Sequence, residues 1–77
     1  MAEVLERGEA VFLRSYSARR AAIAEIVNPD PLPGLDCVEV QLVTDWYGWD
    51  IRTGNDEQPR AGEQIICSKQ RIQTIES

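Results

Sequence analysis

The chain has 77 residues, of which 43% are hydrophobic and 27% charged, and its formal net charge is −5. So short a chain can build only one hydrophobic core, so residues 1–77 are expected to form a single small domain. No apolar run approaches the roughly 18 residues that a membrane span requires, and the first residues lack the features of a secretory signal. We therefore expect a cytoplasmic protein that does not cross a membrane.

The residue types exclude several kinds of chemistry. The chain has no histidine, and its two cysteines, Cys37 and Cys67, do not form a C-x-x-C motif. Without imidazole, neither a Ser-His-Asp nor a Cys-His nucleophile can be built, and the usual zinc ligand sets cannot be assembled within one chain. Two cysteines are far fewer than in disulfide-stapled secreted domains, so we expect free thiols. The composition favours a non-enzymatic protein without cofactor or metal.

The first third of the chain is ambiguous between helix and strand. A short β-prone run, Ala10–Leu13, follows Gly8. The next segment, Ala18–Val27, contains four alanines and by intrinsic propensity favours a helix. Tertiary contacts can override that preference, so the conformation of Ala18–Val27 decides between the two folds considered below.

The rest of the chain is punctuated more clearly. Three prolines in Asn28–Gly34 forbid a helix or a central strand there and predict a loop. Alternating apolar and polar residues predict a strand over Cys37–Val43, and short β-prone runs predict strands at Gln64–Cys67 and Ile72–Ile75. Between the last two, Ser68–Arg71 is long enough for one tight turn only.

This order of elements resembles an SH3-like five-stranded barrel, which is the mainly β fold that we expect. The likeness is to the barrels of the photosystem I stromal subunit and of the ferredoxin–thioredoxin reductase variable chain, and it rests on spacing alone. The expected strands are Glu9–Arg14, Ala21–Val27, Val38–Thr44, Gln64–Cys67 and Ile72–Ile75. The alternative is an α+β fold in which one or two N-terminal helices pack on a three-stranded antiparallel sheet.

An aromatic segment lies in the long connection after the third expected strand. Three of the five aromatic residues of the chain fall within four positions of it. Large rigid rings and arginine dominate binding hot spots, so this segment is the expected surface for a protein partner. Its candidate partner-binding residues are Asp45, Trp46, Tyr47, Trp49, Asp50 and Arg52. The alternative is that Trp46 and Trp49 cap an open end of the barrel.

Other readings of these residues have less support. Asp45 and Asp50 flank the aromatic rings as a glycosidase acid and base would, but a 77-residue chain offers little depth for a substrate cleft, and we expect solvated turn residues. Arg14, Arg19 and Arg20 cluster near the first turn. A net-negative chain with one lysine gains little from counterion release, so nucleic-acid binding is not favoured.

A second class of function is a small ligand binder or enzyme whose site forms between subunits. Association into a homo-oligomer would help so small a domain to bury apolar surface. Glu63–Ile66 resembles the Val-Gln-Ile-Tyr strand of the trimethoprim-insensitive plasmid type of dihydrofolate reductase, in which a tetramer encloses one central pore. Here Gln64 and Ile65 are kept, and the valine and tyrosine are lost. A non-enzymatic interaction module or accessory protein therefore remains the leading hypothesis.

Overall fold

The structure is a computed structural model, and it describes residues 5–16, 20–48, 51 and 58–75. These residues form one antiparallel sheet and contain no α-helix. In chain order the elements are β1 (Ala10–Leu13), β2 (Ala22–Asn28), β3 (Cys37–Leu42), β4 (Gln64–Ser68), the 3-10 turn η1 (Lys69–Arg71) and β5 (Ile72–Thr74). The expectation of a mainly β fold is confirmed, and every strand bound lies within two residues of the predicted one.

The alanine-rich segment forms the central strand of the sheet. Ala22, Ala24 and Ile26 are buried, whereas Ile23 and Glu25 between them are exposed. This period of two is that of a strand with one face on the core. The α+β alternative is therefore wrong. β2 pairs with a strand on each side, so ladder hydrogen bonds and burial outweigh the helix propensity of alanine.

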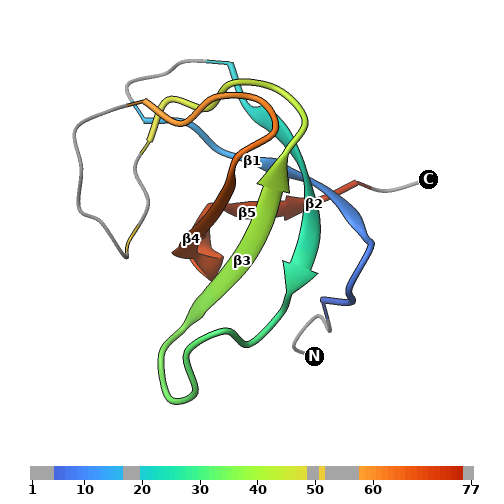
Figure 1. Ribbon diagram of the computed structural model, residues 1–77, viewed down its shortest axis with the longest axis vertical. Coiled ribbons are helices and arrows are strands. Elements are labelled where there is room, and N and C mark those ends of the chain that lie inside the picture. Colours follow the sequence, from blue (N-terminus) through green and yellow to red (C-terminus); the bar gives the residue numbers. More distant parts are fainter. Residues whose placement is uncertain (1–4, 17–19, 49–50, 52–57, 76–77) are drawn as a thin grey trace.

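The strands follow the order β4-β3-β2-β1-β5, and β1 and β5 cross behind β2 and β3 in Figure 1. The two edge strands are joined by η1 alone, so the sheet curls strongly. The amide of Lys69 donates to the carbonyl of Asp36 at 3.1 Å, and the amide of Arg14 donates to the carbonyl of Arg71 at 2.8 Å. The sheet is nevertheless not closed, so the closed barrel that we expected is not confirmed.

A bulge bends the sheet where β2 meets β3. Ile26 lies opposite Val40 and Asn28 lies opposite Glu39, which leaves Val27 without a partner in the register. Beyond the bulge, the predicted loop is confirmed: the side chain of Asn28 accepts a hydrogen bond from the amide of Asp30 at 3.0 Å. In such an Asx turn, the asparagine side chain provides the hydrogen bond that a neighbouring strand would otherwise provide, so the chain can leave the sheet here. Val27 also lines the groove described below, which lies on the outer face of the sheet.

The core lies on the concave side of the sheet and receives side chains from all five strands. Its buried members are Val11, Leu13, Ala22, Ala24, Ile26, Val38, Val40, Leu42, Trp46, Ile65 and Cys67. Leu5, Tyr16 and Ile72 are partly buried against them. Both cysteines are buried, and neither forms a disulfide. No helix in the described part of the chain has the length and apolar character that crossing a membrane takes.

Candidate functional site

Trp46, the first ring of the predicted aromatic segment, is a core residue. Its side chain is 0% exposed, and its indole N–H donates to the carbonyl of Arg14 at 3.0 Å. The ring of Tyr16 packs on it with centroids 6.1 Å apart, and Gly48 lies against the indole on another side. The expectation that Trp46 faces outward to a partner is therefore wrong. The buried position of Trp46 agrees instead with the alternative, in which this indole closes one end of the core.

Of the other residues of the aromatic segment, the structure describes Tyr47 and Asp45. Tyr47 is 37% exposed, and its carbonyl accepts the amide of Tyr16 at 2.8 Å. Asp45 is exposed, and its carboxylate accepts the amide of Ala61 at 2.8 Å, which ties the two ends of the β3–β4 connection together. Trp49, Asp50 and Arg52 lie outside the described residues. Within the described part, the segment thus presents one aromatic ring to solvent, not a cluster.

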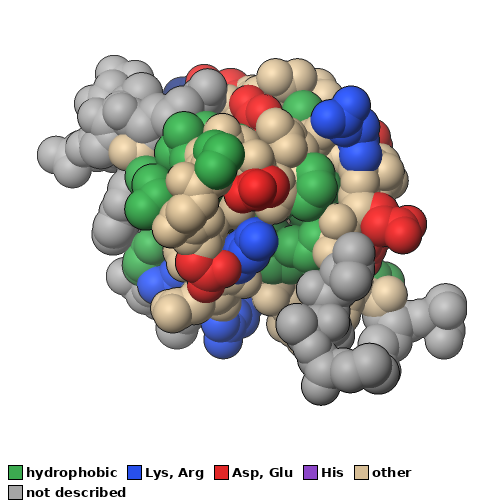
Figure 2. Space-filling model, turned by 90° about the horizontal axis from the view of Figure 1, so that it is seen from below, with side chains coloured by type: hydrophobic (Ala, Val, Ile, Leu, Met, Phe, Trp, Pro, Cys, Tyr) green, Lys and Arg blue, Asp and Glu red, His purple; other side chains and the backbone are tan. Residues whose placement is uncertain are grey.

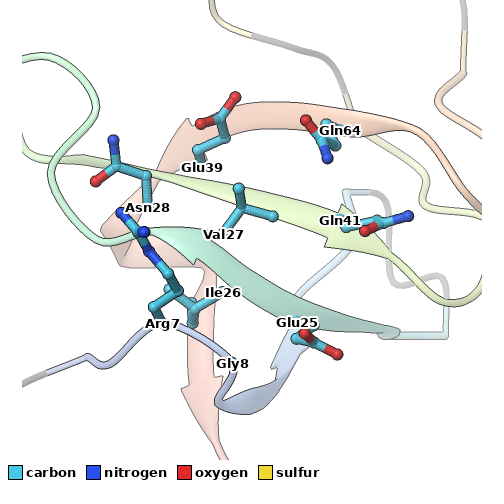
Figure 3. Close-up of a pocket in the computed structure, with 9 residues that line it drawn as sticks. All are labelled: Arg7, Gly8, Glu25, Ile26, Val27, Asn28, Glu39, Gln41 and Gln64. Carbon is cyan, nitrogen blue, oxygen red and sulfur yellow. The ribbon is translucent and has the colours of Figure 1, made fainter.

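A groove of about 420 Å³ lies on the outer face of the sheet, over β2, β3 and β4 (Figure 3). Its polar lining consists of Arg7, Glu25, Asn28, Glu39, Gln41 and Gln64. In Figure 3 Arg7 and Asn28 lie at one end of the groove, whereas Glu25, Gln41 and Gln64 lie toward the other. The groove therefore offers carboxylates, amides and one guanidinium. The guanidinium comes from the segment before β1, and the other groups come from one face of the sheet.

The register explains how this lining forms. Glu25 of β2 lies opposite Gln41 of β3, and Gln41 lies opposite Gln64 of β4. Directly opposed residues have Cβ atoms about 4.5–5.5 Å apart, so the three polar side chains form one row across three strands. Glu39 and Asn28 form the beginning of the next row. The strands hold these groups at fixed spacing, as a binding surface requires.

An apolar row runs beside this polar row on the same face. Phe12 of β1 lies opposite Ile23 of β2, and the amide of Val43 donates to the carbonyl of Ile23 at 2.7 Å. Ile23 is 38% exposed and Val43 is 56% exposed, and Phe12 is half-buried. We call Phe12, Ile23 and Val43 the apolar row. Side chains of this size left in water at neighbouring positions are typical of surfaces that a partner covers.

No protein family model matches the chain, and no curated protein or solved structure matches it either. The candidate site therefore stands on its own geometry. Within the described residues, no group of three or more Cys, Asp or Glu side chains is placed to hold a metal ion. Hydrogen bonding and burial of the apolar row are what this arrangement offers chemically.

Sequence reasoning did not select this surface as a binding site, although part of its arrangement is visible in the sequence. The alternation in Cys37–Val43 placed Glu39 and Gln41 together on the outer side of that strand. Glu25 and Ile23 could not be added, because their place on the same face depends on Ala18–Val27 being a strand. The signal was present in the alternation of Ala22, Ile23, Ala24 and Glu25, but alanine is too small to mark a buried position clearly.

Proposed function

We propose that the chain is a non-enzymatic interaction module that binds a protein partner across the outer face of β2 and β3. The observation that carries the proposal is the apolar row, in which Ile23 and Val43 are exposed and Phe12 is half-buried, beside the groove lined by Glu25 and Gln41. Burial of the apolar row supplies the free energy of association, and the polar row fixes the register of the partner.

The chemistry of the surface suits an extended polypeptide segment. The side-chain amide of Gln41 can both donate and accept hydrogen bonds, which is what the peptide groups of an extended segment need. Glu25 lies two residues from Ile23 on the same strand face, so a lysine or arginine next to an apolar side chain of the partner meets both. We therefore propose a partner segment that is basic and partly apolar.

The fold assignment belongs to the same proposal. We infer that the sheet is an SH3-like barrel that opens between β4 and β5. The strand order, the strong curl, and the position of η1 across the two sheet edges support this assignment. In this setting the module acts in the cytoplasm as a small accessory or modulator subunit of a larger protein.

A peptide library displayed on phage tests the proposal directly. Selection on the whole chain is expected to enrich basic segments with spaced apolar residues. Their binding should be lost in Ile23→Ser/Val43→Ser and weakened in Glu25→Gln, because these changes remove the apolar row and the outer carboxylate. Leu35→Ser is the matched control, since Leu35 is 59% exposed and lies in the β2–β3 loop, away from this face. Enriched peptides that bind all four proteins equally would contradict the proposal.

The second candidate is a small-molecule site between copies of the chain. The groove has a volume within the range of roughly 300–1,000 Å³ that is usual for ligand pockets, and Gln41 and Gln64 are among its lining residues. Light scattering distinguishes the candidates. A symmetric oligomer that is disrupted by Gln41→Ala or Ile23→Ser favours the intersubunit site, whereas a monomer that binds the selected peptides favours the interaction module.

A further inference from the structure

We propose that Arg14 and Arg71 form a binding site for an oxyanion, the carboxylate or phosphate group of an acidic peptide, at the junction of β1 and η1. This site is separate from the groove and does not depend on the function proposed for it. Arg14 directly follows β1, and Arg71 is the last residue of η1. Their backbones are joined by the 2.8 Å hydrogen bond from the amide of Arg14 to the carbonyl of Arg71.

Both guanidinium groups are held in place by neutral partners. The guanidinium of Arg14 donates to the carbonyl of Gln70, the residue before Arg71. The Cζ atom of Arg71 lies 3.6 Å from the ring centroid of Tyr16, in a cation–π contact. Tyr16 in turn packs on the buried ring of Trp46, so the support extends into the core. Less rotamer entropy is therefore lost when a ligand binds, because both side chains are already oriented.

The two groups keep donors available for a ligand. A guanidinium has five N–H donors, and the contact to Gln70 uses the donors of one nitrogen of Arg14. A cation–π contact leaves the N–H donors of a guanidinium available for hydrogen bonds, so the contact with Tyr16 does not use up those of Arg71. No carboxylate among the described residues forms an ion pair with either arginine, although the chain is acidic overall. Unpaired, oriented arginines are the usual receptors of carboxylate and phosphate.

The charge distribution favours a peptide over a nucleic acid as the source of the oxyanion. The site has two fixed guanidinium groups, and Arg20 lies in the connection that follows β1. A nucleic acid presents many phosphates and would have to approach a chain of net charge −5, from which it gains little counterion release. A short acidic segment presents only the few negative charges that this site can pair. The Figure 2 view shows basic, acidic and hydrophobic side chains interspersed, without a broad basic face.

The first experiment follows the Nε–Hε signals of the arginines by NMR while inorganic phosphate is added, with chloride at equal ionic strength as the reference. We expect saturable shifts at Arg14 and Arg71 in phosphate only. Arg60 is the control, because it is exposed and lies in the β3–β4 connection. Shifts at Arg60 as large as those at Arg71, or no difference between phosphate and chloride, would overturn the proposal.

A second experiment uses variants to distinguish a formed site from charge alone. Arg71→Lys keeps the charge but loses the planar fork, so the phosphate affinity is expected to fall roughly tenfold, about the effect of one charge-assisted hydrogen bond. Arg60→Gln should leave the affinity unchanged. Near-ultraviolet circular dichroism shows whether the packing of Trp46 survives in each variant. A well-folded Arg71→Lys protein that binds like the parent contradicts the proposal.

The third experiment identifies the source of the oxyanion. A glutamate-rich peptide and the same peptide with phosphoserine are each added, and both are expected to shift the Arg14 and Arg71 signals and to compete with phosphate. The stronger of the two tells whether carboxylate or phosphate is preferred. A single-stranded DNA that binds more tightly than either peptide at the same ionic strength would overturn the assignment to a peptide.

Discussion

The indole N–H of Trp46 donates a 3.0 Å hydrogen bond to the carbonyl oxygen of Arg14, which lies 32 residues earlier in the chain. Trp46 thereby ties the long β3–β4 connection to the end of β1 while its ring fills the core. The same residue supports the proposed oxyanion site, because Tyr16 stands between the indole and Arg71. Trp46, which the sequence suggested as a contact for a partner, thus supports Tyr16 and through it Arg71 of the proposed site.

The first prediction concerns this tie. Trp46→Phe removes the indole N–H donor and part of the buried ring, so we expect the free energy of unfolding to fall by about 1–3 kcal/mol. Urea denaturation followed by far-ultraviolet circular dichroism measures the change. Leu35→Ala is the control: this side chain is 59% exposed, and its loss should change stability by less than about 0.5 kcal/mol. Equal losses in the two variants would show that Trp46 is not a core residue.

The second prediction concerns Gly48, where the indole passes close to the backbone. A Cβ atom at this position would lie 2.4 Å from Cζ2 and 2.5 Å from Cη2 of Trp46. We expect Gly48→Ala to cost about 1–3 kcal/mol through this overlap, and Trp46→Phe in the same chain to relieve part of the cost, because those two atoms are absent from phenylalanine. A double-mutant cycle in urea measures the coupling.

Gly62 gives the matched control for that cycle. It has a φ of +92° and open space around its missing Cβ atom, so Gly62→Ala destabilises through backbone strain and not through overlap. The cost of Gly62→Ala should therefore add to that of Trp46→Phe. Coupling of the same size at both glycines would mean that the overlap at Gly48 is not the cause.

The fold could be predicted from sequence only where the alternation of residues was unambiguous. Val38, Val40 and Leu42 alternate with Glu39 and Gln41, and their strand appears within one or two residues of the predicted bounds. In Ala18–Val27 the same alternation is carried by alanine on the inner side, and alanine has the highest helix propensity of all residues. Only the pairing of β2 with strands on both sides decides the conformation, and pairing is not visible in one segment.

The candidate site was harder to predict for a related reason. The aromatic segment has the composition of a binding surface, but large rings are also what a 77-residue domain needs to complete its core. Burial of Trp46 is set by its neighbours Tyr16 and Gly48, which come from two different connections. The groove depends in turn on cross-strand register, and a one-residue shift would move Glu25 to the other face.

The third prediction tests the inward face of β2. Ala24 is 0% exposed and lies opposite Val11 and Leu42 on the neighbouring strands. Ala24→Leu inserts three carbon atoms into a filled core, so we expect a loss of about 1–3 kcal/mol in the free energy of unfolding. Ile23→Leu, one residue earlier and on the outer face, should be close to neutral. The two free energies of unfolding are measured in urea. A larger loss for Ala24→Leu than for Ile23→Leu supports a strand in which neighbouring residues face opposite sides, and equal losses would contradict it.

The last prediction concerns the thiols. Cys37 of β3 lies opposite Ser68, whereas Cys67 of β4 lies opposite Val38. Successive residues of a strand point to opposite faces, so the two sulfur atoms lie on different sides of the sheet and cannot bond without a change of register. We expect no intramolecular disulfide after mild oxidation, which mass spectrometry after alkylation detects as two modified thiols.

Because both thiols are buried, a thiol reagent should label them slowly in buffer and rapidly in urea. Rapid labelling of either thiol in the folded protein, or a mass two hydrogens lower, would contradict this arrangement.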